Sequence, residues 1–155
     1  MKIQDDLTKY ISTALNNTLP EKTKIKTRFH LLDAIVSILT GRLLPPGQKG
    51  FNFSKNQGGV QEATLLGNNI KVSAINAAFS NGMAAHANET DDSHTKGRFH
   101  PGCAIIPTTL AIAEKENLTS EEIFKGIALG YDIGVRFTTS PVSYTHLTLP
   151  TMIRV

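Results

Sequence analysis

The loop spanning residues 86–102 holds most of the side chains in this sequence that are able to do chemistry. It combines imidazoles, carboxylates, a hydroxyl and two cations, namely His86, Glu89, Asp91, Asp92, Ser93, His94, Lys96, Arg98 and His100. Imidazole exchanges protons near neutral pH, and a carboxylate can orient it. Loops this rich in titratable groups, lying between apolar segments, are a common place for active sites. This loop is therefore the candidate site.

Residue chemistry alone leaves three interpretations of the loop. A metal site fits the residue types, but the spacing is irregular and no HExxH or comparable ligand pattern is present. The second is proton transfer by His100, with free backbone N–H groups at the helix start near Gly102, and the two loop cations, attracting a substrate carboxylate. The third is a structural turn in which Asp91, Asp92 and Ser93 only cap backbone groups. The metal signal is weak, and the other two interpretations stay open.

Three further residues with reactive side chains are expected to be structural. His86 lies on the face of a predicted helix, at its end, and His30 lies within a mostly apolar predicted helix. In both places an isolated imidazole is usually packed and hydrogen-bonded. Cys103 is the only cysteine, so the chain forms no internal disulfide, and we interpret it as a packing residue. A single cysteine also agrees with a reducing compartment.

The segments around the loop are predicted to be helices, because apolar residues recur at i, i+3 and i+4. The expected helices cover residues 5–17, 20–41, a short stretch ending at 57 that follows a break at 45–47, 73–86, 103–116 and 119–138. Residues 64–66 and 70–72 are expected to form a small β-hairpin. The predicted fold class is therefore mainly α: a helical bundle of about five to six helices with one small β-hairpin.

The last two predicted helices carry more specific signals. Thr119 and Glu122 have the spacing of a capping box. Gly126, Gly130 and Gly134 fall on one helix face, where they would let a neighbouring helix approach closely. Pro107 is expected in or near the first turn of its helix, where proline is tolerated.

Composition and charge exclude several classes of protein. The chain is 40% hydrophobic and 19% charged, with a formal charge of +3. No stretch approaches the roughly 18 uninterrupted apolar residues of a membrane helix, and the N-terminus does not have the layout of a signal peptide. The basic stretch at 22–28 has no interleaved aromatics of the kind that stack on nucleic-acid bases. We therefore expect a cytoplasmic protein with no membrane or nucleic-acid partner.

Several motifs occur in one order along residues 5 to 139. In and after the loop they are Ala77–His86, Glu89–His94, His100–Gly102, Ile106–Glu114 and Gly126–Arg136, and before it Leu32–Asp33, Leu44–Gly47 and Glu62–Gly67. Together they resemble the MmgE/PrpD family. Members include 2-methylcitrate dehydratase, cis-aconitate decarboxylase and an iminodisuccinate epimerase. The resemblance implies proton transfer at carbon on a small di- or tricarboxylate, with no metal or organic cofactor.

The resemblance also implies roles for individual residues. His100 matches the family's active-site histidine before Pro-Gly, Ser93 falls where Thr or Ser follows paired aspartates, and Glu89 stands where many members have Asp. These three are the expected catalytic residues. The expected supporting or substrate-binding residues are Asp91, Asp92, His94, Lys96, Arg98 and Gly102. No metal ligand is expected.

Family members are several hundred residues long, with a large all-helical domain, a smaller α+β lid and usually a homodimeric assembly. Their second active-site histidine, in a His-Pro-Thr context, and their later lysines have no counterpart here, and His146 with Leu147 and Thr148 does not reproduce them. We expect residues 1–140 to be the N-terminal portion of the helical domain of a truncated lyase or isomerase (dehydratase, decarboxylase or epimerase). Alone it is expected to be inactive, and full-length protein is expected to be a homodimer. The alternative is a non-catalytic helical interaction or dimerisation module.

Residues 141–155 differ in style from the rest of the chain. They have no helical pattern and one formal charge, on Arg154. The segment resembles a translated sequencing adapter. We interpret it as a non-family tail of artefactual origin and leave it out of the fold prediction.

Overall fold

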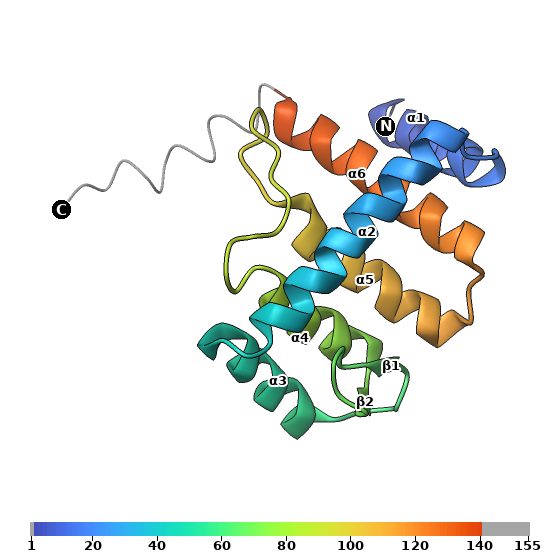
Figure 1. The fold of residues 1–155 in the computed structure, drawn as a ribbon. Coiled ribbons are helices and arrows are strands. Elements are labelled where there is room, and N and C mark those ends of the chain that lie inside the picture. Colours follow the sequence, from blue (N-terminus) through green and yellow to red (C-terminus); the bar gives the residue numbers. More distant parts are fainter. Residues whose placement is uncertain (1, 141–155) are drawn as a thin grey trace.

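The computed structural model describes residues 2–140, and the tail at 141–155 lies outside the described residues. The described part is mainly helical with one antiparallel hairpin (Figure 1). Its elements are α1 (Lys2–Asn16), α2 (Glu21–Gly41), α3 (Pro45–Gln57), β1 (Ala63–Thr64), β2 (Lys71–Val72), α4 (Ala74–Ala85), α5 (Pro101–Glu116) and α6 (Ser120–Thr139). The predicted fold class is confirmed.

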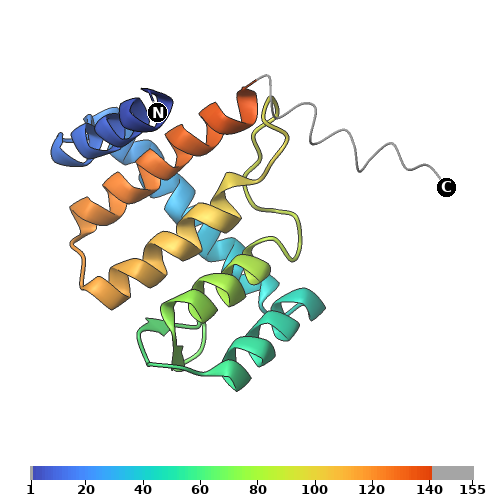
Figure 2. The ribbon, with the colours of Figure 1, turned by 180° about the vertical axis from the view of Figure 1, so that it is seen from behind.

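Helix α5 lies at the centre of the packing. It contacts α4 on one side and α6 on the other, while the long α2 crosses all three helices (Figure 1). Helix α3 and the hairpin cover α4, as the view from behind shows (Figure 2). The buried core is made largely of small side chains, with alanines beside Ile38, Ile106 and Ile127. Because α5 is held on several sides, the start of this helix is a fixed platform for the loop that precedes it.

Two prolines begin helices, and a third lies inside one. Pro45 is the first residue of α3, so it starts that helix instead of breaking the chain before it. Helix α5 begins at Pro101, where a missing N–H costs nothing. Pro107 therefore lies within α5 and not in its first turn, which corrects the prediction. Proline has no N–H, so Pro107 cannot donate a hydrogen bond to the carbonyl of Cys103, one turn earlier. That carbonyl oxygen lies close to Gly82 of α4, and a Cβ added to Gly82 would be 2.9 Å from it.

The glycines of α6 do allow close packing against α5. A Cβ built on Gly130 would lie 2.7 Å from Cγ2 of Ile105, whereas one built on Gly134 would meet nothing nearer than 3.7 Å. Both residues are helical, so alanine gains up to about 1 kcal/mol of helix propensity at either position.

We expect Gly130→Ala and Gly134→Ala to change the free energy of unfolding in opposite directions. At Gly130 the clash with a β-branched side chain should cost about 1–3 kcal/mol, which outweighs the propensity gain. Gly134→Ala should raise stability by about 0.5–1 kcal/mol. Urea denaturation of the two variants and the parent chain measures both effects. Equal stability changes in the two variants would contradict the packing described here.

The capping box at the start of α6 is confirmed. Glu122 N–H donates to Thr119 Oγ1 at 3.4 Å, and Thr119 N–H donates to Glu122 Oε2 at 2.8 Å. Hydrogen bonds from the Thr119 side chain and backbone lower the pKa of the Glu122 carboxyl below its usual value. The ionised form of Glu122 therefore stabilises the fold.

Thr119→Ala is expected to lower the free energy of unfolding by about 1 kcal/mol. Thr8→Ala, on the exposed face of α1, is the matched control and should change it by less than about 0.5 kcal/mol. The Glu122 contribution should be present above its unfolded pKa and be lost as the pH falls through the lowered folded value. Denaturation curves at pH 7 and at acid pH should therefore show a smaller difference in free energy of unfolding between Thr119→Ala and the parent chain in acid. A difference that stays the same at both pH values would contradict this prediction.

The outer face of α2 carries an apolar stripe with alternating spacings of four and three residues, and Leu43, just after the end of the helix, continues this spacing. Its members are 40% to 68% exposed within the described chain, namely Ile25, Phe29, Leu32, Val36, Leu39 and Leu43. Such spacing suits packing against another helix. We call this surface the α2 stripe.

None of the helices within residues 2–140 has both the length and the apolar composition needed to cross a membrane.

Candidate active site

The candidate loop joins the end of α4 to the start of α5, and a histidine stands at each end. His86 is the C-cap of α4 and His100 is the N-cap of α5. Between them the loop turns back on itself, because His94 and Phe99 form an isolated bridge and Arg98 N–H donates to the His94 carbonyl at 2.8 Å. The loop lies beside the C-terminal part of α6 (Figure 2). This fold-back brings the two terminal histidines together.

Both imidazoles face the carboxylate of Asp91. His86 Nδ1 lies 3.1 Å from Asp91 Oδ1, and His100 Nδ1 lies 3.5 Å from the same oxygen. The ring centroids of the two histidines are 4.7 Å apart. The Asp91 side chain has no exposed surface. One buried carboxylate is thus shared by two imidazoles from the two ends of the loop.

This geometry defines which ring atom is available for chemistry. An ionised carboxylate only accepts hydrogen bonds, so His86 Nδ1 carries the proton in that contact and Nε2 is left as the acceptor. The His86 side chain is 47% exposed and that of His100 33%. Within residues 2–140, His100 Nδ1 is buried without a hydrogen-bond partner. The His86 imidazole is therefore oriented by a hydrogen bond to Asp91, the His100 imidazole faces the same carboxylate, and both rings remain partly accessible from solvent.

Asp92 has a different set of partners. Its Oδ1 accepts the N–H of Gly102 at 2.8 Å, and its Oδ2 accepts the Tyr131 hydroxyl at 2.6 Å and lies 3.0 Å from His30 Nδ1. The rings of His30 and Tyr131 are 4.5 Å apart. Burial and the bond to Asp92 raise the pKa of Tyr131, so its hydroxyl stays a donor. Asp92 therefore ties α2, α5 and α6 together.

The contact with Asp92 changes one expectation. The N–H of Gly102 was expected to be free for a substrate carboxylate, but it is already bonded to Asp92. Pro101, the first residue of α5, has no N–H to offer. Neither of these two positions of the helix start therefore offers a free N–H to a substrate carboxylate.

The remaining predicted site residues lie at the surface of the loop. Glu89, Ser93, Lys96 and Arg98 are exposed, and no hydrogen bond within residues 2–140 joins the Glu89 or Ser93 side chain to Asp91 or the two imidazoles. Glu89 has φ 53°, a left-handed conformation uncommon for a residue with a side chain. His94 is half-buried, and its Nδ1 accepts the Gly97 N–H at 3.0 Å.

Four residues of this region were not among the predicted site residues. The sequence predicts structural roles for His86, His30 and Cys103, and Tyr131 lies in a predicted helix without a predicted role. His30 and Tyr131 both contact Asp92, which is far from them in the sequence, so no local sequence pattern could predict these contacts. Cys103 donates its thiol to the His100 carbonyl at 3.2 Å. Burial, followed by the charge of Asp91, raises the pKa of this thiol to about 11.

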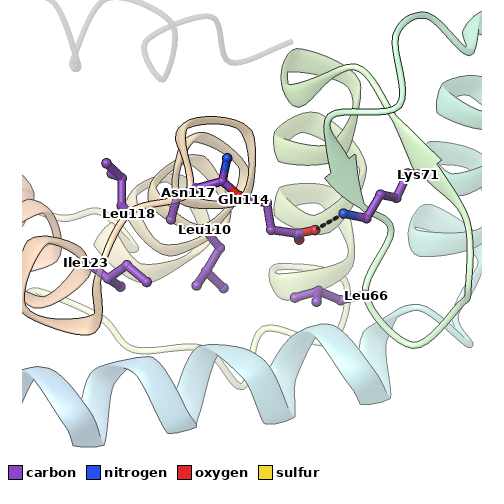
Figure 3. A pocket seen from close by; sticks show the side chains of 8 residues that line it. Leu66, Lys71, Leu110, Glu114, Asn117, Leu118 and Ile123 are labelled. Atoms are coloured by element: carbon purple, nitrogen blue, oxygen red, sulfur yellow. Dashed lines mark ion pairs between the residues drawn. The ribbon is translucent and has the colours of Figure 1, made fainter.

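An open pocket lies away from the paired histidines, between α5, the start of α6 and the hairpin (Figure 3). Its volume is about 470 Å³, and its lining includes Leu110, Ile123 and the ion pair of Lys71 with Glu114, 3.2 Å apart. The Glu114 carboxylate also accepts the hydroxyl and N–H of Thr64. Its acceptors are used to hold the hairpin, and no imidazole lines this pocket. The pocket is therefore a weaker candidate for proton transfer than the loop.

Comparison with known proteins supports the sequence motifs. A family model described as the MmgE/PrpD N-terminal domain matches residues 5–153. No curated protein sequence matches the chain. The matched region includes the whole loop and the helices that position it, and it covers far more than half of the chain. It also extends to residue 153, so the match does not separate residues 141–153 from the family in the way that the interpretation of the tail does. The chain therefore belongs to the MmgE/PrpD family.

Proposed function

We propose that this chain supplies the acid–base wall of an active site that transfers a proton at a carbon atom of a small di- or tricarboxylate. The reaction class is that of a lyase or isomerase, namely a dehydratase, a decarboxylase or an epimerase. The observation that supports it most is the buried Asp91 carboxylate with the Nδ1 atoms of His86 and His100 at 3.1 and 3.5 Å. Family membership supports the same class of chemistry.

In this proposal Asp91 orients the imidazoles and does not itself exchange protons with substrate. A carboxylate on Nδ1 holds the ring with Nε2 outward and stabilises the imidazolium that forms when Nε2 takes a proton. His100 acts as the acid/base, and His86, whose ring is 4.7 Å away, is placed to serve as its partner. In a dehydration, one ring would take the proton from carbon while the other gives a proton to the departing hydroxyl. No metal or organic cofactor takes part.

The exposed loop residues complete this wall. We assign contact with substrate oxygen to Ser93 and Glu89, and long-range attraction of the anionic substrate to the positive charges of Lys96 and Arg98. The other walls would come from further polypeptide of the family enzyme, in a cytoplasmic homodimer. We expect the domain on its own to turn over substrate poorly, because acid–base groups without substrate-positioning groups lose most of their effect.

A second function is favoured by one observation, the exposed α2 stripe. A helical interaction or dimerisation module would use this apolar surface without any catalysis. The same stripe also suits helices of a complete enzyme, so the stripe by itself does not distinguish the two functions.

We expect the isolated domain to self-associate through the α2 stripe. Phe29→Ser together with Leu32→Ser should shift it towards monomer in light-scattering measurements after gel filtration, because both side chains are more than half exposed. Ile75→Ser, on an exposed site of α4, is the control and should leave association unchanged. A parent chain that is monomeric at all concentrations would contradict this prediction.

The experiment that tests the proposed reaction is solvent deuterium exchange into substrate. The gene product that contains this domain would be incubated in D2O with a panel of di- and tricarboxylates and with matched monocarboxylates. Proton NMR should show deuterium entering a C–H position of at least one polycarboxylate, and none of the monocarboxylates. Absence of exchange and turnover with the whole panel would overturn the proposal and favour the interaction module.

A further inference from the structure

Three donor atoms of different chemistry meet behind the candidate loop. A ring nitrogen of His86, a carboxylate oxygen of Asp91 and Cys103 Sγ all lie within 4.8 Å of one another. His86 is the C-cap of α4, Asp91 belongs to the loop, and Cys103 belongs to the first turn of α5. The proposed reaction uses the imidazole and the carboxylate but gives the thiol no role.

We propose that His86, Asp91 and Cys103 form a binding site for one divalent transition-metal ion of the Zn²⁺ class. Imidazole nitrogen, carboxylate oxygen and thiolate sulfur are the three protein ligand types that zinc uses. Bond lengths of about 2.0–2.3 Å in a tetrahedral site put ligand atoms about 3.3–3.8 Å apart. The donors here are separated by 3.1 Å (His86 Nδ1 to Asp91 Oδ1) and by no more than 4.8 Å overall. Closing them around an ion therefore needs movements of only about an ångström.

The surroundings favour a soft or borderline cation over a hard one. A thiolate and an imidazole are poor ligands for Mg²⁺ and Ca²⁺, which prefer oxygen. The carboxylate contributed by Asp91 has no exposed surface, so an ion bound to it is partly shielded from water. His86 is 47% exposed, which gives the ion an entry path and leaves room for a water or a ligand as the fourth partner. Binding forms the metal–sulfur bond and releases the thiol proton of Cys103 to solvent.

Metal binding and proton transfer would exclude each other at this site. An ion on His86 Nδ1 and Asp91 breaks the contact that orients the imidazoles, so Zn²⁺ would inhibit turnover. Only the predicted inhibition depends on the proposed function, because the metal site itself is inferred from the positions of the three donor atoms.

The test uses Co²⁺ as a spectroscopic probe for Zn²⁺, on the purified chain kept reduced with a non-thiol reductant. We expect about one equivalent of Co²⁺ to give a thiolate-to-metal charge-transfer band and tetrahedral visible bands, both abolished by added Zn²⁺ and not by Mg²⁺. Cys103→Ser should abolish the charge-transfer band, and both Cys103→Ser and His86→Ala should weaken Zn²⁺ binding more than about tenfold. His94→Gln, on the same loop but outside the cluster, is the matched control and should bind as the parent does.

Two results would overturn the proposal. One is the absence of a charge-transfer band in the parent chain. The other is Zn²⁺ binding that Cys103→Ser and His86→Ala leave unchanged, or that His94→Gln weakens equally, since either means adventitious surface binding. Thermal melts identify variants that do not fold, and for such a variant Cys103→Ala or His86→Gln replaces it in the same comparison. Because none of these readouts involves turnover, they stand whether or not the proposed reaction is found.

Discussion

Replacing Asp92 with alanine is expected to lower the free energy of unfolding by about 3 kcal/mol. The substitution removes the acceptor for the Gly102 N–H, the Tyr131 hydroxyl and the His30 imidazole at once. Hydrogen bonds to a charged group contribute about 1.5–3 kcal/mol each. The Asp92 side chain is 16% exposed, so water will form some of the hydrogen bonds that the substitution removes. The expected loss of stability is therefore smaller than the sum for three separate hydrogen bonds.

Two further variants sharpen this prediction. Asp92→Asn keeps a carbonyl acceptor and should lose less stability than Asp92→Ala. Asp33→Ala removes an exposed carboxylate from α2 near the same place and should change stability by less than about 0.5 kcal/mol. Urea denaturation gives all three values. A loss below about 1 kcal/mol for Asp92→Ala would mean that Asp92 does not hold α2, α5 and α6 together.

Replacing His100 with alanine is expected to lower turnover by about 10²–10⁴-fold in the gene product that contains this domain. The reason is that the proposed acid/base is lost while Asp91 and His86 remain in place. The side chain is one-third exposed and its Nδ1 makes no hydrogen bond to the described part of the chain, so the fold should persist. Thr95→Ala is the matched control, because Thr95 is an exposed residue of the same loop with no assigned role in the site.

Steady-state kinetics on the substrate found by deuterium exchange would measure this effect, with a thermal melt to check folding. His86→Ala should lower turnover as well, since its ring shares the carboxylate of Asp91. Turnover unchanged in His100→Ala would refute the role given to this residue. A loss equal to that of Thr95→Ala would instead indicate a general disturbance of the loop.

The helical fold could be predicted from the sequence because its signals are local. Apolar periodicity identified the helices, and the spacing of Thr119 and Glu122 identified a capping box that the structure contains. The start of α5 was misjudged because polar residues and glycine dominate up to Gly102. What starts this helix two residues earlier is Pro101 together with a contact from Asp92, ten residues away in the chain.

The candidate loop could also be identified from the sequence, but its internal order could not. Composition indicated that residues 86–102 held the chemistry, whereas the division of labour between Asp91 and Asp92 depends on which way each carboxylate turns. Asp91 turns to His86 and His100, and Asp92 turns to His30 and Tyr131. Adjacent residues with the same side chain give no pattern that predicts this difference. The roles of Glu89 and Ser93 stay predictions.

The central claim is that the Asp91 carboxylate faces the two imidazoles of an acid–base centre, with a hydrogen bond to His86, while Asp92 joins the helices. The most direct test is a long-range ¹H–¹⁵N correlation spectrum of the histidine rings in the parent chain, in Asp91→Asn and in Asp92→Asn. Loss of the Asp91 carboxylate should shift the ring signals of His86 and His100 and leave those of His30 in place, and Asp92→Asn should do the reverse. Unchanged His86 and His100 signals in Asp91→Asn would contradict the claim.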